Sequence, residues 1–369
     1  MTGIAGLEVG LPRSIDEVDA AWMTEVLRCS GAIDGDTSVT GIDCEPFAVG
    51  AGLLSLLFRA SLTYSGAAPD APSTVVVKLP MDHPVQRGIA DGLGFYPREI
   101  RFYRELAPKS DLRTPVVHAA MIADDCTDFV VVMQDLSNHG VADQRVGATW
   151  EQACASVDAM AAFHAPWCGC DELAGLAGTF PPLLNPVYQQ MLPQVFASGF
   201  AHAKIHAPDL LQPELLAFGD RYGELMDFML TANNEPATII HGDWRLDNLF
   251  FGDDGSVTVI DFQITGQGSG AYDLGYFVSQ SIATEVRRGR EMELIDRYLD
   301  GLAARGVQRD RDEVVRQFKI AVAQCFIYGI SSFESYPDLP QRSKDLMRLL
   351  LDRSARTILD MDALAELPS

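Results

Sequence analysis

The pattern of apolar residues changes near residue 136, and this change limits the folds that the chain can adopt. Before that point, short apolar runs and turn residues predict strands in the order β-β-β-α-β-β, with the helix at residues 96–110. After it, helical periodicity dominates, at residues 149–167, 186–200, 209–230, 285–303, 311–331 and 341–363. A chain of 369 residues also exceeds what one hydrophobic core usually supports. We therefore expect an α+β protein with a small antiparallel β-sheet lobe at 1–136 and a larger, mainly helical lobe at 141–369.

Local signals predict where some of these elements begin. Ser14 and Glu17 have the spacing of a capping box, which places the start of a further helix there. Thr149 and Gln152 have the same spacing at the start of the helix at 149–167. The glycine-rich run at residues 266–270 lacks the lysine of a phosphate-binding loop, so we expect a flexible loop.

The charge of the chain excludes some classes of partner. The formal net charge is −23, from 28 basic and 51 acidic residues. Such a surface repels nucleic acid and anionic membranes, and it tolerates a cationic small molecule; the acidity is equally compatible with a role in solubility alone. We see no apolar run of the ~18 residues that a membrane span needs, no signal peptide and no disulfide framework among the seven cysteines. We expect a cytoplasmic protein with no obligate protein partner.

The stretch HGDWRLDNLF, residues 241–250, carries more polar side chains than a buried strand would tolerate. Asp243 and Asn248 lie five residues apart in a predicted loop, and Asp261 follows 13 residues later, at the end of the run VTVID. This spacing suits phosphoryl transfer, in which a loop aspartate accepts or orients the proton of the substrate hydroxyl. Asn248 and Asp261 supply the oxygen ligands that Mg²⁺ requires. His241 is expected to bind the loop backbone, because the chemistry already has its carboxylate.

The segments HGDWRLDN and VIDFQ resemble a known motif, HGDxxxxN followed by D[FW]. It is the motif of small-molecule phosphotransferases with the protein-kinase-like fold: aminoglycoside and macrolide phosphotransferases, choline kinases and the ecdysteroid-kinase-like group. The resemblance implies the two-lobed kinase fold with a hinge at about residues 133–140. It also implies ATP and Mg²⁺ as cofactors, Asp243 as catalytic base, and Asn248 and Asp261 as metal ligands.

Further segments resemble the nucleotide-binding elements of this fold. VGAGLLS resembles the glycine-rich loop over the phosphates, with Gly50 and Gly52 in place and Ser55 where a third glycine usually stands. VVVKLP puts Lys78 where kinases bind the α- and β-phosphates, and Glu99, 21 residues later, is the expected partner of this lysine. FVVVMQDLS resembles the strand that leads into the hinge, where the backbone of residues Gln134 and Leu136 would contact adenine.

Two departures from the protein-kinase pattern bear on the substrate. DFG is replaced by DFQ, and only 11 residues separate Asp261 from Asp273, too few for a segment that binds a peptide. The acceptor is therefore expected to be a small molecule. Arg245 stands where protein kinases often have lysine, and it could offset the charge that builds on the γ-phosphate.

We expect an ATP- and Mg²⁺-dependent kinase that phosphorylates a hydroxyl of an aminoglycoside, macrolide, choline-like or hydrophobic alcohol acceptor. The ecdysteroid-kinase-like resemblance favours a hydrophobic alcohol, in a pocket lined by Trp167, Trp244, Tyr272 and Phe277. The alternative is a catalytically silent, pseudokinase-like module that binds a nucleotide or metabolite. The preference for ATP over GTP stays open.

Overall fold

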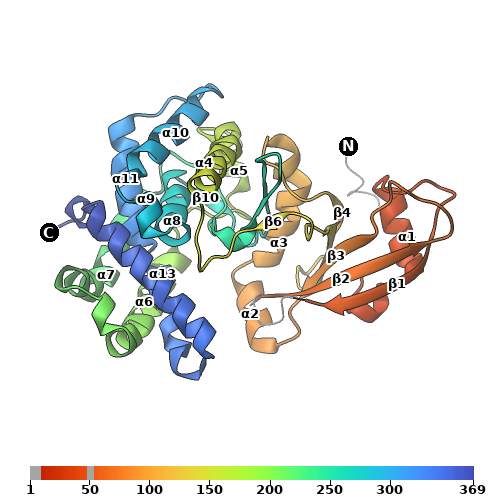
Figure 1. Ribbon diagram of the computed structural model, residues 1–369, viewed down its shortest axis with the longest axis horizontal. Coiled ribbons are helices and arrows are strands. Elements are labelled where there is room, and N and C mark those ends of the chain that lie inside the picture. The colour runs from red at the N-terminus through yellow and green to blue at the C-terminus, as the bar shows by residue number, and fades with distance from the viewer. Residues whose placement is uncertain (1–9, 48–53) are drawn as a thin grey trace. The chain divides into compact units, whose positions relative to one another are not determined.

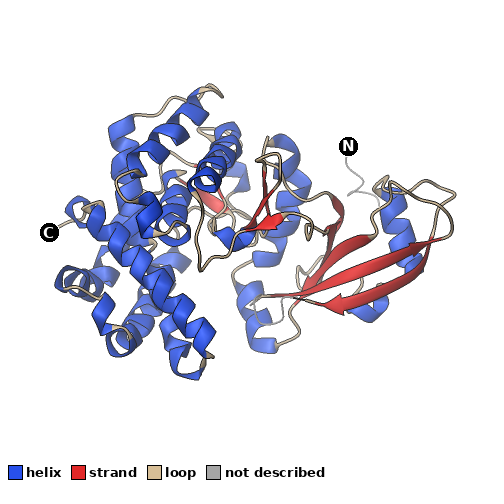
Figure 2. Cartoon of the chain, viewed as in Figure 1, coloured by secondary structure: helices blue, strands red, loops and turns tan. Residues whose placement is uncertain are grey.

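The structure, a computed structural model, describes residues 10–47 and 54–369 (Figure 1). The chain divides into two compact units, Met1–His139 with Val259–Ile264, and Gly140–Thr258 with Thr265–Ser369. In Figure 2 the long strands gather in the first unit and most helices in the second. Among the described residues, no helix combines the length and the apolar character that crossing a membrane requires.

The first unit contains a five-stranded antiparallel sheet in the order β1-β2-β3-β5-β4. The strands are β1 (Val39–Pro46), β2 (Ser55–Tyr64), β3 (Thr74–Pro80), β4 (Val117–Ile122) and β5 (Phe129–Gln134). The predicted strand order along the chain is thus confirmed. Its helices are α1 (Ala20–Cys29), α2 (Pro84–Gly92) and α3 (Phe95–Arg101), and the last continues through a π-helical turn at Phe102–Leu106. α2 was not predicted.

The two faces of the central strand β3 have different roles because successive side chains point to opposite sides of a sheet. Val75 and Val77 share a hydrophobic core with Met23 and Leu27 of α1. Lys78 lies on the other face, toward α3, and contacts Glu99 there. The period of two in VVVKLP therefore turns the lysine away from the α1 core.

The capping box predicted at Ser14 is wrong. Ser14 makes no capping hydrogen bond, and Oε2 of Glu17 instead accepts one from the backbone N–H of Arg13 at 2.8 Å. A 3-10 turn at Ile15–Glu17 ends at Val18, and α1 begins only at Ala20. Its cap is Asp19, which accepts a 2.7 Å hydrogen bond from the Trp22 N–H.

The second unit is mainly helical, as predicted. Its helices are α4 (Trp150–His164), α5 (Leu173–Leu176), α6 (Pro186–His206), α7 (Pro213–Ala232), α8 (Ala271–Ser281), α9 (Thr284–Arg287), α10 (Glu291–Ala303), α11 (Arg311–Gln324), α12 (Phe326–Ile330) and α13 (Gln341–Asp360). Every residue of α8 is buried, so this helix forms the centre of the unit. The capping box of Thr149 and Gln152 is confirmed at the start of α4.

Two small sheets lie in the second unit, except for Val259 at the end of β9, which belongs to the first. One has the order β6 (Gly140–Val141), β8 (Leu249–Phe251), β9 (Val257–Val259), and the other pairs β7 (Thr238–Ile240) with β10 (Gly266–Gly268). The flexible loop predicted at 266–270 is wrong, because β10 is a fully buried strand. A Cβ at Gly268 would lie 2.6 Å from Leu183 Cδ1, so glycine serves close packing there.

Candidate active site

Lys78 and Glu99 form a buried ion pair in the first unit. Lys78 Nζ lies 2.9 Å from Glu99 Oε1 and 2.8 Å from Oε2, and the Glu99 side chain is fully buried. The same ammonium contacts Asp261 Oδ1 at 3.0 Å. Burial alone would lower the pKa of Lys78, but the carboxylates of Asp261 and Glu99 raise it above its ordinary value. The ammonium is therefore charged across the physiological pH range.

Asp261 is held in an unusual backbone conformation. Its φ of +67° lies in the left-handed region, which aspartate tolerates better than most residues. The next side chain, Phe262, stacks on Phe102 with a centroid separation of 3.4 Å. One residue further, Gln263 Nε2 donates a 3.2 Å hydrogen bond to Ser55 Oγ. The segment after β9 is thus fixed on both sides, and the Asp261 carboxylate remains one-third exposed.

The remaining nucleotide-binding predictions are only partly described. Gly50 and Gly52 lie outside the described residues. The N–H of Gln134 donates to the Val116 carbonyl at 2.8 Å, so an adenine contact at this residue would have to use its carbonyl. Leu136 is buried, and its carbonyl accepts a 2.8 Å bond from the His139 N–H.

In the second unit, the Asp243 carboxylate receives hydrogen bonds on both of its oxygens. Oδ1 accepts from the hydroxyl of Tyr276 at 2.7 Å. Oδ2 accepts from Arg245 Nε and from Asn248 Nδ2, both at 3.1 Å. About one-fifth of the side chain is exposed. The carboxylate is therefore held in place and remains accessible to solvent.

Asn248 faces Asp243 with its amide nitrogen. Nδ2 also donates to the Asp243 backbone carbonyl at 2.9 Å, which fixes the amide orientation in this hydrogen-bond network. The amide oxygen is consequently the atom that Asn248 can offer to a cation. The five-residue spacing brings the two side chains together through the 3-10 turn at Leu246–Asn248.

Arg245 links two carboxylates. Besides its contact with Asp243, its Nη1 lies 2.7 Å from Asp247 Oδ2. The charge of Asp243, which has the largest effect, raises the pKa of the guanidinium above its ordinary value. Burial raises the pKa of the Asp247 carboxyl, and Arg245 offsets part of this effect. Arg245 thus places a permanent positive charge directly beside Asp243.

Asp273 in α8 anchors the backbone that precedes Asp243. Its Oδ2 accepts from the His241 N–H at 2.7 Å and its Oδ1 from the Gly242 N–H at 2.9 Å. Gly242 has φ +83°, a conformation that glycine adopts at no steric cost. His164 Nε2 lies 3.1 Å from Oδ2, and all of these groups are buried or nearly so. This network sets the direction in which the loop leaves β7.

Comparison with known protein families agrees with the interpretation of the HGDWRLDN motif in this loop. The sequence model of the ecdysteroid kinase-like family matches residues 49–306, well over half of the chain. The chain belongs to the ecdysteroid kinase-like family. As a member of this family, the chain is a small-molecule kinase, as the sequence motifs predicted. No curated protein matches the sequence significantly.

Solved structures show the same fold at low identity. A Cryptosporidium parvum choline kinase is 13% identical with a TM-score of 0.55, over 92% of this chain and 95% of that one. A Ralstonia eutropha protein assigned to the aminoglycoside phosphotransferases is 17% identical with a TM-score of 0.51, over 94% and 99%. A GDP complex of an aminoglycoside 2'-phosphotransferase variant is 14% identical with a TM-score of 0.50, over 94% and 98%. The predicted protein-kinase-like fold of this ecdysteroid kinase-like protein is confirmed.

The structure groups the predicted residues by unit. Lys78, Glu99 and Asp261 meet in the first unit, whereas Asp243, Arg245 and Asn248 meet in the second. The aromatic pocket predicted for the acceptor is wrong, because the four side chains are at most 5% exposed and belong to the core: Trp167, Trp244, Tyr272 and Phe277. The role of Tyr276 was missed, since a contact across 33 residues leaves no local signal.

Proposed function

We propose that this protein transfers the γ-phosphoryl group of ATP to a hydroxyl of a small molecule, directly and in line. The observation that supports this most is the Asp243 carboxylate, held by Tyr276, Arg245 and Asn248 yet one-fifth exposed. A positioned and accessible carboxylate is what a general base for a hydroxyl needs. The sequence motif and the family membership agree with this role.

In this proposal Asp243 accepts the proton of the acceptor hydroxyl through the carboxylate oxygen that the hydroxyl reaches. Arg245 would offset negative charge on the transferred phosphoryl group, because its guanidinium is charged and one-third exposed. Asp273 would act by positioning, since it holds the backbone on the N-terminal side of Asp243.

Asn248 and Asp261 fit Mg²⁺ by the chemistry of their donors. Each offers an oxygen: the amide oxygen of Asn248, whose nitrogen is committed to Asp243, and the partly exposed carboxylate of Asp261. Among the described residues no cluster of three His, Cys, Asp or Glu side chains could hold a metal alone. Two protein oxygens with phosphates completing the shell is a common Mg²⁺ arrangement. Bound Mg²⁺ would neutralise charge on the phosphates.

Lys78 is proposed to bind the α- and β-phosphates, with Glu99 holding the ammonium in position. The fully buried Glu99 supports this assignment, since it has no evident purpose without the lysine. Gly50, Gly52 and Ser55 would cover the phosphates with backbone N–H groups and a hydroxyl. Adenine would contact the backbone of residues 134 and 136.

The acceptor is proposed to be a hydrophobic alcohol, with amine-bearing acceptors as the class to test beside it. The first choice rests on the family to which the chain belongs. The second rests on the compared choline kinase and aminoglycoside phosphotransferases and on the net charge of −23. Near Asp243, the partly exposed ring of Tyr328, which lies tilted against Tyr276 at a centroid separation of 4.3 Å, would favour an acceptor with an apolar face.

The test is a product screen. The protein is incubated with ATP or GTP, with and without Mg²⁺, and with sterols, macrolides, aminoglycosides and choline. Mass spectrometry then looks for a phosphorylated acceptor. We expect a Mg²⁺-dependent product with at least one hydroxyl acceptor. Nucleotide binding without turnover of any acceptor would contradict the proposal and favour a silent binding module.

A further inference from the structure

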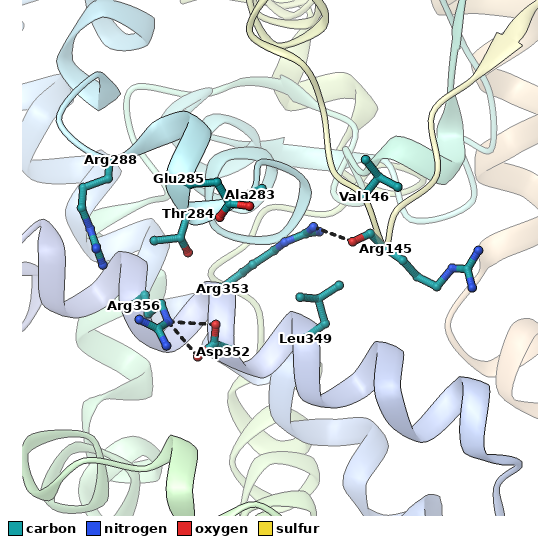
Figure 3. Close-up of a pocket in the computed structure, with 10 residues that line it drawn as sticks. All are labelled: Arg145, Val146, Ala283, Thr284, Glu285, Arg288, Leu349, Asp352, Arg353 and Arg356. Carbon is teal, nitrogen blue, oxygen red and sulfur yellow. Dashed lines mark hydrogen bonds and ion pairs between the residues drawn. The ribbon is translucent and has the colours of Figure 1, made fainter.

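A polar cavity in the second unit has no part in the proposed reaction. Its volume is about 360 Å³, and it lies between α9, α13 and the segment at residues 145–146 (Figure 3). Its charged and hydroxyl-bearing lining residues include Thr284, Glu285, Arg288, Asp352, Arg353 and Arg356. Cavities of this size hold small metabolites, but those for apolar ligands have mostly apolar walls. The walls here favour a charged ligand.

Arg353 is the decisive residue, because it is a buried cation without an ion pair. It is 2% exposed, and its guanidinium donates only to neutral backbone carbonyls, those of Gln144 at 2.6 Å, Gln280 at 3.3 Å and Arg145 at 3.0 Å. No carboxylate in the described part of the chain pairs with it. Its buried Nε has no hydrogen-bond partner within the residues that the structure describes. A bound anion would strongly stabilise a buried guanidinium that has no ion pair.

Other donors border the same space. The Thr284 hydroxyl is buried and has no hydrogen-bond partner among residues 10–47 and 54–369. Arg288 and Arg356 lie on the more exposed side and bind Asp360 and Asp352 through Nε alone. Their Nη groups are therefore available within the described structure. Figure 3 shows Arg353 extending across the cavity, while the side chain of Arg145 points away from it.

The Arg353 guanidinium is held in place before any ligand binds. One of the carbonyls that accept from Arg353 is that of Gln144, and the Gln144 side chain is itself fixed. Gln144 Oε1 accepts from the Leu246 N–H at 3.2 Å, and Gln144 Nε2 donates to the Gln280 carbonyl at 2.9 Å. Preorganised donors reduce the entropy lost on binding. Leu246 directly follows Arg245, so the cavity wall adjoins the loop that carries Asp243.

We propose that this cavity binds a small anion with a phosphate group, through Arg353, Thr284, Arg288 and Arg356. Guanidinium groups match the geometry of phosphate and bind it with two parallel hydrogen bonds. Glu285 and Asp352 also line the cavity, but Arg288, Arg353 and Arg356 outnumber them. The local charge is therefore positive, and a doubly charged phosphate would gain more than a singly charged carboxylate. All residues of this proposed anion site belong to the second unit. Anion binding there does not depend on the proposed transfer reaction.

The test is calorimetric titration of the full chain with inorganic phosphate, beside acetate as the monoanion. The double variant Arg288→Ala/Arg356→Ala removes two cations of the cavity. The double variant Arg297→Ala/Arg311→Ala removes two arginines of similar exposure that pair with Asp158 and Asp296 elsewhere, and it is the matched control. Thr284→Val, which keeps the shape and deletes the unpaired hydroxyl, is a milder second variant.

We expect phosphate to bind the wild type and the control variant equally and more tightly than acetate. In Arg288→Ala/Arg356→Ala the Kd should rise by at least about tenfold, and in Thr284→Val by a few-fold. Lys78→Met/Glu99→Gln, which removes the buried charge of Glu99 together with the lysine, should bind phosphate as the wild type does, and this separates the cavity from the nucleotide site. Absence of phosphate binding, equal binding by both arginine double variants, or loss of binding in a folded Lys78→Met/Glu99→Gln protein would overturn the proposal.

Discussion

The hydroxyl of Tyr276 donates a 2.7 Å hydrogen bond to Asp243 Oδ1, the oxygen that Arg245 and Asn248 do not contact. Burial, with the charge of Asp243 adding to it, raises the pKa of the Tyr276 hydroxyl well above its ordinary value. Tyr276 therefore remains a hydrogen-bond donor at any pH at which the protein functions. Tyr276 orients the proposed base. An acceptor hydroxyl that binds Asp243 Oδ1 would have to share this oxygen with the Tyr276 hydroxyl.

Replacing Tyr276 with phenylalanine should lower kcat about tenfold, the value of one hydrogen bond to a charged group. Tyr328→Phe is the control, since the Tyr328 hydroxyl binds that of Tyr272. A kcat that Tyr276→Phe leaves unchanged would assign the tyrosine a purely structural role.

Replacing Lys78 with methionine should abolish turnover and destabilise the protein by about 3–5 kcal/mol, because Glu99 is left buried without its partner. Burial raises the pKa of Glu99, so the pKa is higher in the folded protein than in the unfolded chain. At acid pH Glu99 is therefore protonated in the folded protein, and the neutral carboxyl reduces the destabilisation caused by the loss of Lys78. The loss should thus be larger at pH 8 than at pH 5 in urea unfolding.

The double variant Lys78→Met/Glu99→Gln separates these two effects. It should regain part of the lost stability, because no buried charge remains at position 99. Activity should stay absent, because the phosphate contact is still missing. If the double variant is as unstable as Lys78→Met at both pH values, the ion pair is not the source of the destabilisation.

Replacing Asp273 with asparagine should lower kcat and cost about 2 kcal/mol of stability, since an amide nitrogen cannot accept from a backbone N–H. One of the N–H groups of His241 and Gly242 would be left unsatisfied in a buried position. Steady-state kinetics and urea unfolding measure the two effects. An unchanged kcat with reduced stability would show that the loop geometry does not need this anchor.

His118 in β4 should make the protein less stable in mild acid. Burial lowers its pKa from 6.5 to about 4, so the unfolded chain binds the proton first, and stability is lost as the pH falls from 6.5 toward 4. Between pH 7.5 and 5 the free energy of unfolding should fall by about 2 kcal/mol more in the wild type than in His118→Gln. Parallel pH dependence in the two proteins would refute this.

Local and periodic features of the site were predictable from the sequence. The five-residue spacing of Asp243 and Asn248 does bring the two side chains together. The period of two in β3 places Lys78 on the face of α3, where Glu99 meets it. These relationships depend on the geometry of one turn, one strand and one helix. They follow from the regular directions that side chains take along helices and strands.

Features set by tertiary packing were not predictable. Ser14 and Glu17 fit a capping box, yet the 3-10 turn that follows ends at Val18, and Asp19 caps the helix instead. The glycines of β10 are typical of a loop, but the close approach of Leu183 explains the choice of Gly268. Arg353 gave no signal because its role depends on carbonyls 73 and 209 residues away in the sequence.

The rate of phosphoryl transfer by Asp243→Asn tests the proposed role of Asp243 most directly. The measurement uses the best acceptor from the product screen, at saturating ATP and Mg²⁺, beside Asp220→Asn, an exposed aspartate on α7. We predict that nucleotide affinity is retained, that the transfer rate falls about 10³-fold in Asp243→Asn, and that Asp220→Asn matches the wild type. Transfer by Asp243→Asn at the wild-type rate would contradict the assignment of Asp243 as the base.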